Sequence, residues 1–480
     1  MPARSSTTSV SFEYGDGRVE AELPADTLVL RAGITRPEPE ALPDPVAATR
    51  EAIAHPLDAA PLGDQVGPGS TVTVAFPDRV KGGAHATAHR KVALAAVLDE
   101  LDRAGVRAAD VRLVCAIGLH RKNRRDEFES YLGAETLARL DPAQVVNHDS
   151  EDPDGVVALP DSALGDTVEV NRALVESDLT VLIGHTAGNP YGGFSGGYKM
   201  PATGLTTWRS IRTHHTPASV DRDDFVPVST RSRFRDQLRA IGEATEQAMP
   251  RPFFAVDAVL DASARQLGVF AGAIPAVEQQ SWPLATARTE LAVPGPPADV
   301  LVIGLPRTFH YGPGMGANPI LAMQAVGASL VRAQGALQPD PVIIATAVLD
   351  GWDDAAEFPS YRATYERLVE TGDPAAMTAF EDEFCTNADW VRQHREAFTY
   401  HPFHAFSMVY VGGLARRRAR EVIIAGARDP GLARGMGAVP VPDLDAALAR
   451  ARELVDGAPR VIAVPELSTP AYHLVPGADR

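Results

Sequence analysis

The stretch HTAGNPYGGFSGGYKM, residues 185–200, places five glycines ahead of a single lysine, Lys199. Glycines let backbone amides approach a ligand closely, and amides at the beginning of a helix favour an anion. The stretch matches neither the phosphate-binding pattern G-x-x-x-x-G-K-[ST] nor the dinucleotide pattern G-x-G-x-x-G. It therefore indicates an anion or nucleotide site, or else a plain turn between a strand and a helix.

A second group of polar residues, Asp78, Arg79 and Lys81, follows the run TVTVAFPD, residues 71–78. A carboxylate beside two cations can orient a base or bind a substrate carboxylate through charge-assisted hydrogen bonds. The structural alternative is a solvated turn after a strand.

Three histidines are further candidates. His120 ends the run DVRLVCAIGLH, residues 110–120, and His214 and His215 are adjacent in the sequence. Histidine exchanges protons near neutral pH, so His120 is a candidate acid or base, although a lone histidine is often structural. Adjacent residues do not share a helix face, so one of His214 and His215 is a candidate ligand or base, and a solvent-exposed pair is the alternative.

The elements that carry these residues alternate in type. Residues 71–78, 110–120 and 178–188 read as strands, while 88–105 and 121–140 have the periodicity of helices. This alternation predicts a mainly parallel sheet with helices on both faces. The polar groups then lie at the carboxyl ends of the strands, where open α/β sheets bind their ligands.

The second half of the chain repeats the alternation after a proline- and alanine-rich stretch at 275–297, and 480 residues exceed what one core usually supports. Residues 8–31 read as a hairpin that turns at GDG. We therefore predict an α/β protein of two domains, 1–280 and 281–480, each with a mainly parallel sheet, and an active-site cleft between them.

The bulk composition restricts the partners. Lys and Arg total 45 against 62 Asp and Glu, a net charge of −17, which argues against nucleic acid or an anionic membrane. Two cysteines indicate neither a disulfide framework nor a cysteine zinc site. The N-terminal residues do not read as a signal peptide, and no apolar run approaches about 20 residues. We expect a cytoplasmic protein.

Taken together, these segments resemble the lactate racemase family, whose members use a nickel-pincer nucleotide. Asp78 and Lys81 fit the family pattern D-x-x-R, GLHR fits G-x-H-R at His120, and the family's NHD occurs at 147–149. FSGGYK fits the glycine loop F-S-G-G-x-K, with Lys199 sixteen residues before His215. The resemblance covers residues 8–275 well and the remainder loosely.

The resemblance implies a cofactor and the residues that hold it. Lys199 would be joined through a thioamide to pyridinium-3-thioamide-5-thiocarboxylic acid mononucleotide, which grips nickel through two sulfurs and one ring carbon. His215 would complete the square-planar set, a geometry that suits nickel. The loop amides of Ser195, Gly196 and Gly197 would lie against the cofactor and its phosphate. Separate cofactor-synthesis enzymes would be needed as partners.

The resemblance also implies a hydride relay on a 2-hydroxy acid, and stereoinversion requires a proton-transfer group on each side of the substrate. His120 matches one of them. Asn189 stands at the other position and cannot act as a base, and His185 and Tyr191 are the nearby replacements. Lys81 replaces the substrate-binding arginine, which keeps the charge and loses the bidentate fork.

The substrate side of the second half also departs from the family. The family pattern Y-Q-x-x-K corresponds by eye to Ile320, Leu321 and Gln324. We therefore predict an isomerase that racemises or epimerises a 2-hydroxy acid other than lactate, a larger or polyhydroxylated one, with Asp78 and Lys81 at its substrate site. The alternatives are a non-racemising isomerisation or elimination with the same cofactor, and a nucleotide-binding protein without catalysis. The sequence leaves the oligomeric state open.

Overall fold

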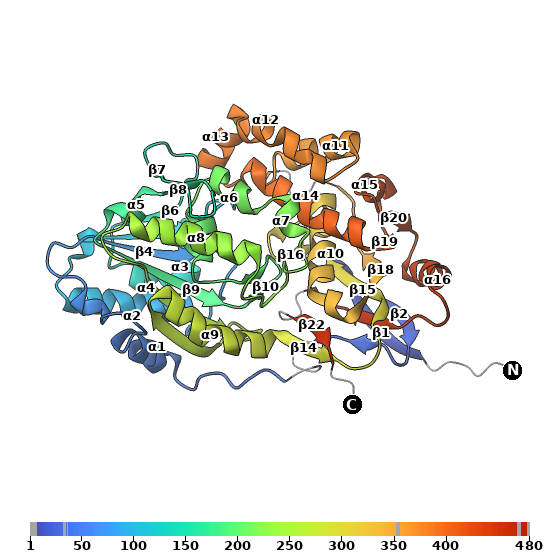
Figure 1. Cartoon of the computed structure of the whole chain (residues 1–480), viewed down its shortest axis with the longest axis horizontal. Helices are drawn as coiled ribbons and strands as arrows, with labels where there is room; N and C mark the ends of the chain where they lie inside the picture. Colours follow the sequence, from blue (N-terminus) through green and yellow to red (C-terminus); the bar gives the residue numbers. More distant parts are fainter. Residues whose placement is uncertain (1–6, 32–34, 36, 352–355, 468–471, 478–480) are drawn as a thin grey trace.

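The computed structural model describes residues 7–31, 35, 37–351, 356–467 and 472–477. Two large sheets lie side by side along the long axis of the molecule, each flanked by helices (Figure 1). The predicted fold class, α/β with mainly parallel sheets, is confirmed.

The first sheet has the strand order β13-β12-β9-β4-β5-β6. Its neighbours run parallel except β12 and β13, which are antiparallel. Its strands are β4 (Val72–Pro77), β5 (Val111–Ala116), β6 (Val145–Asn147), β9 (Leu179–Thr186), β12 (Phe254–Leu260) and β13 (Gln266–Gly272). The predicted strands at 71–78 and 178–188 are therefore confirmed, while the strand predicted over 110–120 ends at Ala116.

The second sheet has the order β2-β1-β15-β18-β19-β20, with β21 beside β15 and β3 beside β21. Its strands are β1 (Thr7–Gly15), β2 (Gly17–Pro24), β3 (Leu28–Val29), β15 (Ala298–Pro306), β18 (Leu337–Thr346), β19 (Glu421–Ala425), β20 (Val439–Val441) and β21 (Val461–Val464). The predicted hairpin is present, but β1 pairs with β15, so the segment 1–280 contributes to both sheets.

Four short strand pairs complete the β structure. They are β7 (Val156–Leu159) with β8 (Val168–Asn171), β10 (Gly188–Asn189) with β11 (Gly193–Phe194), β14 (Glu290–Val293) with β22 (His473–Pro476), and β16 (Thr308–Phe309) with β17 (Gly312–Pro313). The hairpin β10–β11 follows β9, and the hairpin β16–β17 follows β15. Each large sheet thus sends one small hairpin from the carboxyl end of a strand toward the middle of the molecule (Figure 1).

Helices pack around both sheets. Those of the first half are α1 (Pro45–Ala54), α2 (His89–Arg103), α3 (Arg125–Leu132), α4 (Ala134–Leu137), α5 (Arg172–Glu176), α6 (Trp208–His214), α7 (Pro217–Val220), α8 (Arg233–Gln247) and α9 (Ile274–Thr289). Those of the second half are α10 (Pro319–Ala333), α11 (Tyr361–Thr371), α12 (Glu381–Cys385), α13 (Ala388–Glu396), α14 (Pro402–Arg418), α15 (Pro430–Gly435) and α16 (Leu444–Leu454). The helix predicted over 121–140 is divided into α3 and α4 at Gly133, whose φ is 94°.

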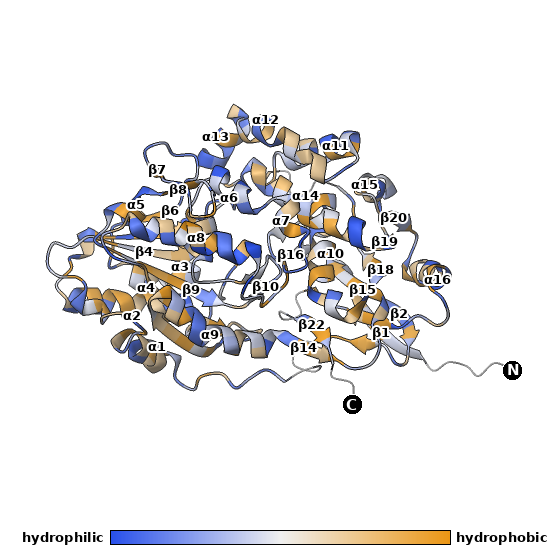
Figure 2. Cartoon of the chain, in the orientation of Figure 1, coloured by the Kyte–Doolittle hydropathy of each residue, from blue (hydrophilic) through white to orange (hydrophobic). Residues whose placement is uncertain are grey.

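Local sequence explains where α10 begins. The Asn318 side chain accepts the backbone N–H of Ile320 at 3.0 Å, and Pro319 takes the first helical position, where no N–H is needed. The helix is buried along nearly its whole length and packs on α14. Figure 2 accordingly colours α10 and strands β15 and β18 mainly as hydrophobic.

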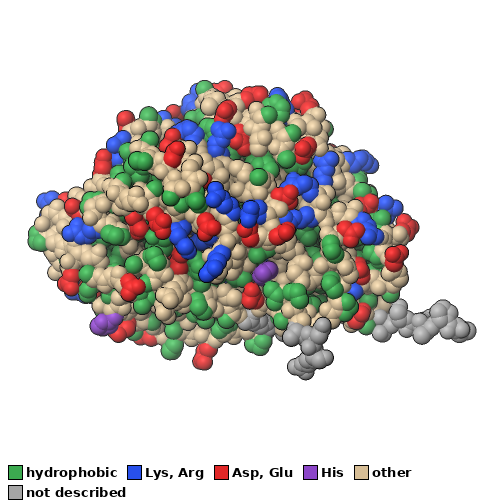
Figure 3. Space-filling view, in the orientation of Figure 1, with side chains coloured by type: hydrophobic (Ala, Val, Ile, Leu, Met, Phe, Trp, Pro, Cys, Tyr) green, Lys and Arg blue, Asp and Glu red, His purple; other side chains and the backbone are tan. Residues whose placement is uncertain are grey.

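The exterior is charged and mixed. Acidic and basic side chains are interspersed over the face shown in Figure 3, so the net charge of −17 is not gathered into one patch on this face. Within the described ranges, every helix is too short or too polar to cross a lipid bilayer.

Candidate active site

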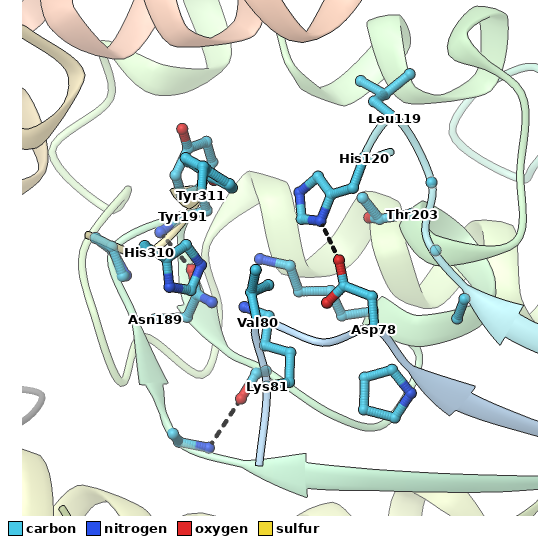
Figure 4. Close-up of a pocket in the computed structure, with 18 of the residues that line it drawn as sticks. Asp78, Val80, Lys81, Leu119, His120, Asn189, Tyr191, Thr203, His310 and Tyr311 are labelled. Carbon is cyan, nitrogen blue, oxygen red and sulfur yellow. Dashed lines mark hydrogen bonds and ion pairs between the residues drawn. The ribbon is translucent and has the colours of Figure 1, made fainter. Parts of the chain in front are cut away.

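A cavity of about 380 Å³ lies between the two halves of the molecule. Residues of both halves line it. From the first half they include Asp78, Lys81, His120, His185, Asn189, Tyr191, Ser195, Gly196, Lys199 and His215, and from the second half His310, Tyr311, Gln324, Arg332, His404 and Ser407 (Figure 4). Of the predicted site residues, Gly197, Arg79 and His214 do not line the cavity.

Asp78 and His120 form a hydrogen-bonded pair. Asp78 follows β4 directly and is buried, and its Oδ2 accepts a hydrogen bond of 2.6 Å from Nδ1 of His120 (Figure 4). Burial by itself would raise the pKa of Asp78, but His120 and Lys81 outweigh it and lower that pKa to about 2. The pair therefore holds Nδ1 of His120 protonated and leaves Nε2 for other partners.

The turn after β5 sets the position of His120. Its backbone N–H donates to the carbonyl of Ile117 at 2.9 Å, and the N–H of Gly118 donates to Gly204 at 2.9 Å. Gly118 has a φ of 54°, and a side chain there would meet the carbonyl oxygen of Thr203. His120 thus belongs to a tight turn and not to the strand predicted to reach it.

Lys81 lies in the turn after β4, where its N–H donates to the carbonyl of Asp78 at 3.2 Å. Burial lowers the pKa of the Lys81 amine, although the charge of Asp78 acts in the opposite direction. No carboxylate of the described residues lies within ion-pair distance of this amine. Lys81 is therefore placed to receive an anion from the cavity.

The glycine loop uses most of its amides internally. The N–H of Gly197 donates to Oδ2 of Asp257 at 3.0 Å, and the N–H of Ser195 donates to the carbonyl of Ala187 at 2.9 Å. Gly196 and Gly197 have positive φ, and side chains on them would collide with the carboxylates of Asp257 and Glu278. The expectation that these amides face a phosphate is therefore wrong for Ser195 and Gly197.

Lys199 ends this loop and precedes a π-helical turn, Met200–Gly204, a distortion that is frequent at functional sites. Its amine lies 5.4 Å from the ring centre of Tyr191 and 5.5 Å from that of Phe234. Burial, followed by the charges of Lys81 and Arg235, holds its pKa well below the usual range. A neutral lysine amine is a nucleophile.

Both adjacent histidines are buried, which corrects the alternative of a solvent-exposed pair. His214 ends α6, and its Nε2 lies 3.4 Å from Oγ1 of Thr203. His215 lines the cavity, and its Nδ1 is buried without a hydrogen-bond partner among the described residues. Its ring packs 5.6 Å from that of Tyr191. Of the two, His215 is the candidate ligand.

The Asn189 side chain stabilises the turn of the β10–β11 hairpin. Its Oδ1 accepts the backbone N–H of Tyr191 at 2.8 Å, the pattern of an Asx turn. The two predicted replacements, His185 and Tyr191, also line the cavity. Burial, with the charges of Lys81 and Arg90, lowers the pKa of His185 to about 3, so this ring is neutral at physiological pH.

The NHD stretch, residues 147–149, makes hydrogen bonds outside the cavity lining. Oδ1 of Asn147 accepts the N–H of Asn123 at 2.8 Å, and Oδ1 of Asn123 accepts the N–H of Arg79 at 2.9 Å. His148 is fully buried and lies 3.1 Å from the carbonyl of Thr206. Asn147 and Asn123 thus fix the turn after β4, and neither they nor His148 line the cavity.

Sequence reasoning missed His310, Arg332 and His404, which the second half brings to the cavity. Burial lowers the pKa of His310 and of His404 well below the usual range. Nδ1 of His404 lies 2.6 Å from the hydroxyl of Tyr361, and its ring packs 5.3 Å from that of His120. His310 follows a strand directly, which is the signal that identified the clusters of the first half.

Comparison with known proteins agrees with this geometry. Residues 14–224 match the family model of the lactate racemase N-terminal domain. The lactate racemase of Thermoanaerobacterium thermosaccharolyticum is 25% identical over 185 residues, which are 38% of this chain and 41% of that protein. That of Lactiplantibacillus plantarum is 24% identical over 173 residues, 36% of this chain and 39% of that protein.

Over residues 14–224 these comparisons support a divergent member of the lactate racemase family. The aligned stretch spans about two fifths of the length of these curated relatives. The solved lactate racemase apoprotein of T. thermosaccharolyticum has the same fold, with a TM-score of 0.71 and 20% identity over 97% of this chain and 100% of that one. A Thermotoga maritima protein of known structure is similar at a TM-score of 0.54 and 14% identity over 92% and 100%.

Proposed function

We propose that this lactate racemase homologue is an isomerase that inverts a 2-hydroxy acid with a nickel-pincer nucleotide held by Lys199 and His215. The observation that carries the proposal is the convergence of Lys199, His215 and the Asp78–His120 pair on one cavity. The changes at Lys81 and Gln324, which both line the cavity, support a substrate other than lactate, whereas Ile320 and Leu321 lie in the core.

The residues present fit the cofactor. The amine of Lys199 is buried with a lowered pKa, as forming an amide-type bond requires, and Nδ1 of His215 is a buried nitrogen without a hydrogen-bond partner. Among the described residues, no group of three His, Cys, Asp or Glu side chains is arranged to hold a metal ion. His215 would supply the one nitrogen donor that a pincer nucleotide needs from the protein. When bound, the cofactor supplies the hydride chemistry.

His120 is one acid–base group in this proposal. Asp78 binds its Nδ1–H, so Nε2 takes the hydroxyl proton of the substrate and later returns a proton. The carboxylate of Asp78 orients the ring. Lys81, which lacks an internal ion pair, binds the substrate carboxylate.

We infer that His310 is the second acid–base group. In Figure 4 it lies on the side of Asn189 and Tyr191, whereas His120 and Asp78 lie on the other side. His404 packs against the His120 ring and therefore does not face the substrate from the opposite side. A base on each side favours inversion over the alternative of hydride return on a single face. A non-catalytic nucleotide-binding role is disfavoured by the intact Asp78–His120 pair.

The test is co-expression with the cofactor-synthesis enzymes, followed by peptide mass analysis, nickel determination and chiral analysis of 2-hydroxy acids. We expect a mass increment on the Lys199 peptide, about one nickel per chain and inversion at one carbon. Lys199→Ala should lose all three. A chain that carries no adduct while the synthesis enzymes are active, or an active Lys199→Ala variant, would refute the proposal.

A further inference from the structure

The cavity contains more basic side chains than are needed to attach the cofactor and to bind one substrate carboxylate. Its basic side chains are Lys81, Lys199 and Arg332, and it has one carboxylate, Asp78, which is bound to His120. Formation of an amide-type bond removes the charge of Lys199. Lys81 balances one substrate carboxylate, so the Arg332 guanidinium remains as a cation with no counter-charge among the described residues that line the cavity.

Arg332 is held in place by packing and not by an acid. It lies in the last turn of α10, 5.8 Å from the ring centre of Tyr472, and its Nε is buried without a hydrogen-bond partner. No Asp or Glu of the described residues lies within ion-pair distance of it. A desolvated guanidinium with no partner is costly, and its planar fork matches a carboxylate or a phosphate.

We propose that Arg332 binds a second anionic group in the cavity, namely the distal carboxylate of a dicarboxylic 2-hydroxy acid whose reacting carboxylate lies on Lys81. The inference rests on the proposed function, since it names the substrate class of the same site. It also accounts for Gln324 at the position where the family has a lysine, because the second cation comes instead from Arg332, farther along the same helix.

The phosphate of the cofactor has the same chemistry as a distal carboxylate, but the surroundings favour the substrate side. The charge of Arg332 acts on Lys81 and His310, which line the substrate region in this proposal. The cations that act on Lys199 are Lys81 and Arg235. Arg332 therefore acts electrostatically on the substrate-binding lysine, and it lines the same cavity.

The experiment is calorimetric titration of the full chain, both loaded with cofactor and with unmodified Lys199. The probes are malate, 2-hydroxyglutarate, lactate and inorganic phosphate. We expect at least one dicarboxylate to bind 10-fold or more tightly than lactate. Arg332→Gln should weaken that binding by about 10- to 100-fold and leave lactate within twofold. Arg332→Lys should retain part of the preference, and the exposed Arg231→Gln should change nothing.

Other outcomes overturn the inference. One is that lactate and both dicarboxylates bind equally tightly to the chain. Another is that neither dicarboxylate binds to the cofactor-loaded or to the unmodified chain. A third is that Arg332→Gln weakens lactate binding as much as it weakens dicarboxylate binding. If Arg332→Gln weakens only phosphate and lowers the adduct on Lys199, the guanidinium serves the nucleotide. Failure of the proposed function is separate, since it appears as a missing adduct whether or not the unmodified chain prefers dicarboxylates.

Discussion

At the scale of single residues, the chemistry centres on a histidine whose two nitrogens have different partners. Nδ1 of His120 is bound to Asp78, while Nε2 is the nitrogen that the proposed function assigns to the substrate hydroxyl. The same division recurs where a buried carboxylate holds a catalytic imidazole in one tautomer. The orienting carboxylate and the base should therefore contribute unequally to the rate.

We expect His120→Gln to lower kcat for inversion by about 100- to 10,000-fold, because the proton-transfer group is removed. Asp78→Asn should also lower kcat, with little change in cofactor loading, since the amide retains the shape but not the charge. Initial rates by chiral chromatography, normalised to the Lys199 adduct, measure both effects. Unchanged rates in His120→Gln would exclude this residue as the base.

At the scale of elements, the glycine loop 185–200 is shaped by carboxylates beneath it. Asp257 accepts the N–H of Gly197, and Glu278 forms an ion pair with Arg235 against the loop. The loop therefore positions Lys199 through buried polar contacts. Its conformation should depend on the size of residue 197 and on the protonation of Asp257.

Gly197→Ala should lower the free energy of unfolding by about 1–3 kcal/mol, because residue 197 has a φ of 52° and its side chain would collide with Glu278. Gly67→Ala is the matched control, since a side chain there meets open space and its φ is not positive. Urea unfolding of both variants measures the difference. Equal stability of the two would contradict this account of the loop.

The pH dependence of stability should report on Asp257. Burial raises its pKa from 3.8 to about 6, although the hydrogen bond from Gly197 lowers it. The folded state then keeps the proton longer than the unfolded state, so this group favours folding at low pH and loses that effect as the pH rises through 6. Relative to Asp257→Asn, the wild-type chain should lose about 1–2 kcal/mol between pH 5 and 7.5. If the unfolding free energies of the wild type and Asp257→Asn change with pH by the same amount, the raised pKa of Asp257 is refuted.

At the scale of the whole molecule, ion pairs join the two halves beside the cavity. Nε of Arg121 lies 3.3 Å from a carboxylate oxygen of Glu357, and Lys122 donates to the carbonyl of Arg395 at 2.5 Å. One further contact between the halves joins Nε2 of His401 to a carboxylate oxygen of Glu151 at 3.1 Å. Because Arg121 follows His120 directly, these contacts connect the docking of the halves to the position of the base.

Glu357→Gln should lower the free energy of unfolding by about 1–2 kcal/mol, since Arg121 is buried and loses one of its two acidic partners. Glu366→Gln is the control, because its pair with Arg362 is exposed and should contribute less than about 0.5 kcal/mol. Thermal and urea unfolding measure both. A larger loss in Glu366→Gln than in Glu357→Gln would contradict the prediction.

The sequence by itself determined the strand–helix alternation, the α/β class and the cluster of Asp78, Lys81, His120, Lys199 and His215. The alternation and the grouping of Asp78, Lys81 and His120 depend on local periodicity and on the rule that parallel strands end at one edge of a sheet. Lys199 was indicated by its glycine-rich stretch, and His215 was chosen over His214 by the resemblance to the lactate racemase family. Short-range patterns also located the N-terminal hairpin, but they did not predict which strand it pairs with. Such features need no knowledge of contacts between distant segments.

Only the tertiary structure decided which sheet the hairpin joins, where the amides of the glycine loop point, and which residues of the second half complete the cavity. The pairing of β1 with β15 joins residues nearly 300 positions apart, and His310 and Arg332 reach the site of Asp78 across the docked halves. These arrangements follow from burying apolar surface between the halves. No spacing along the chain records which distant side chains that burial brings together.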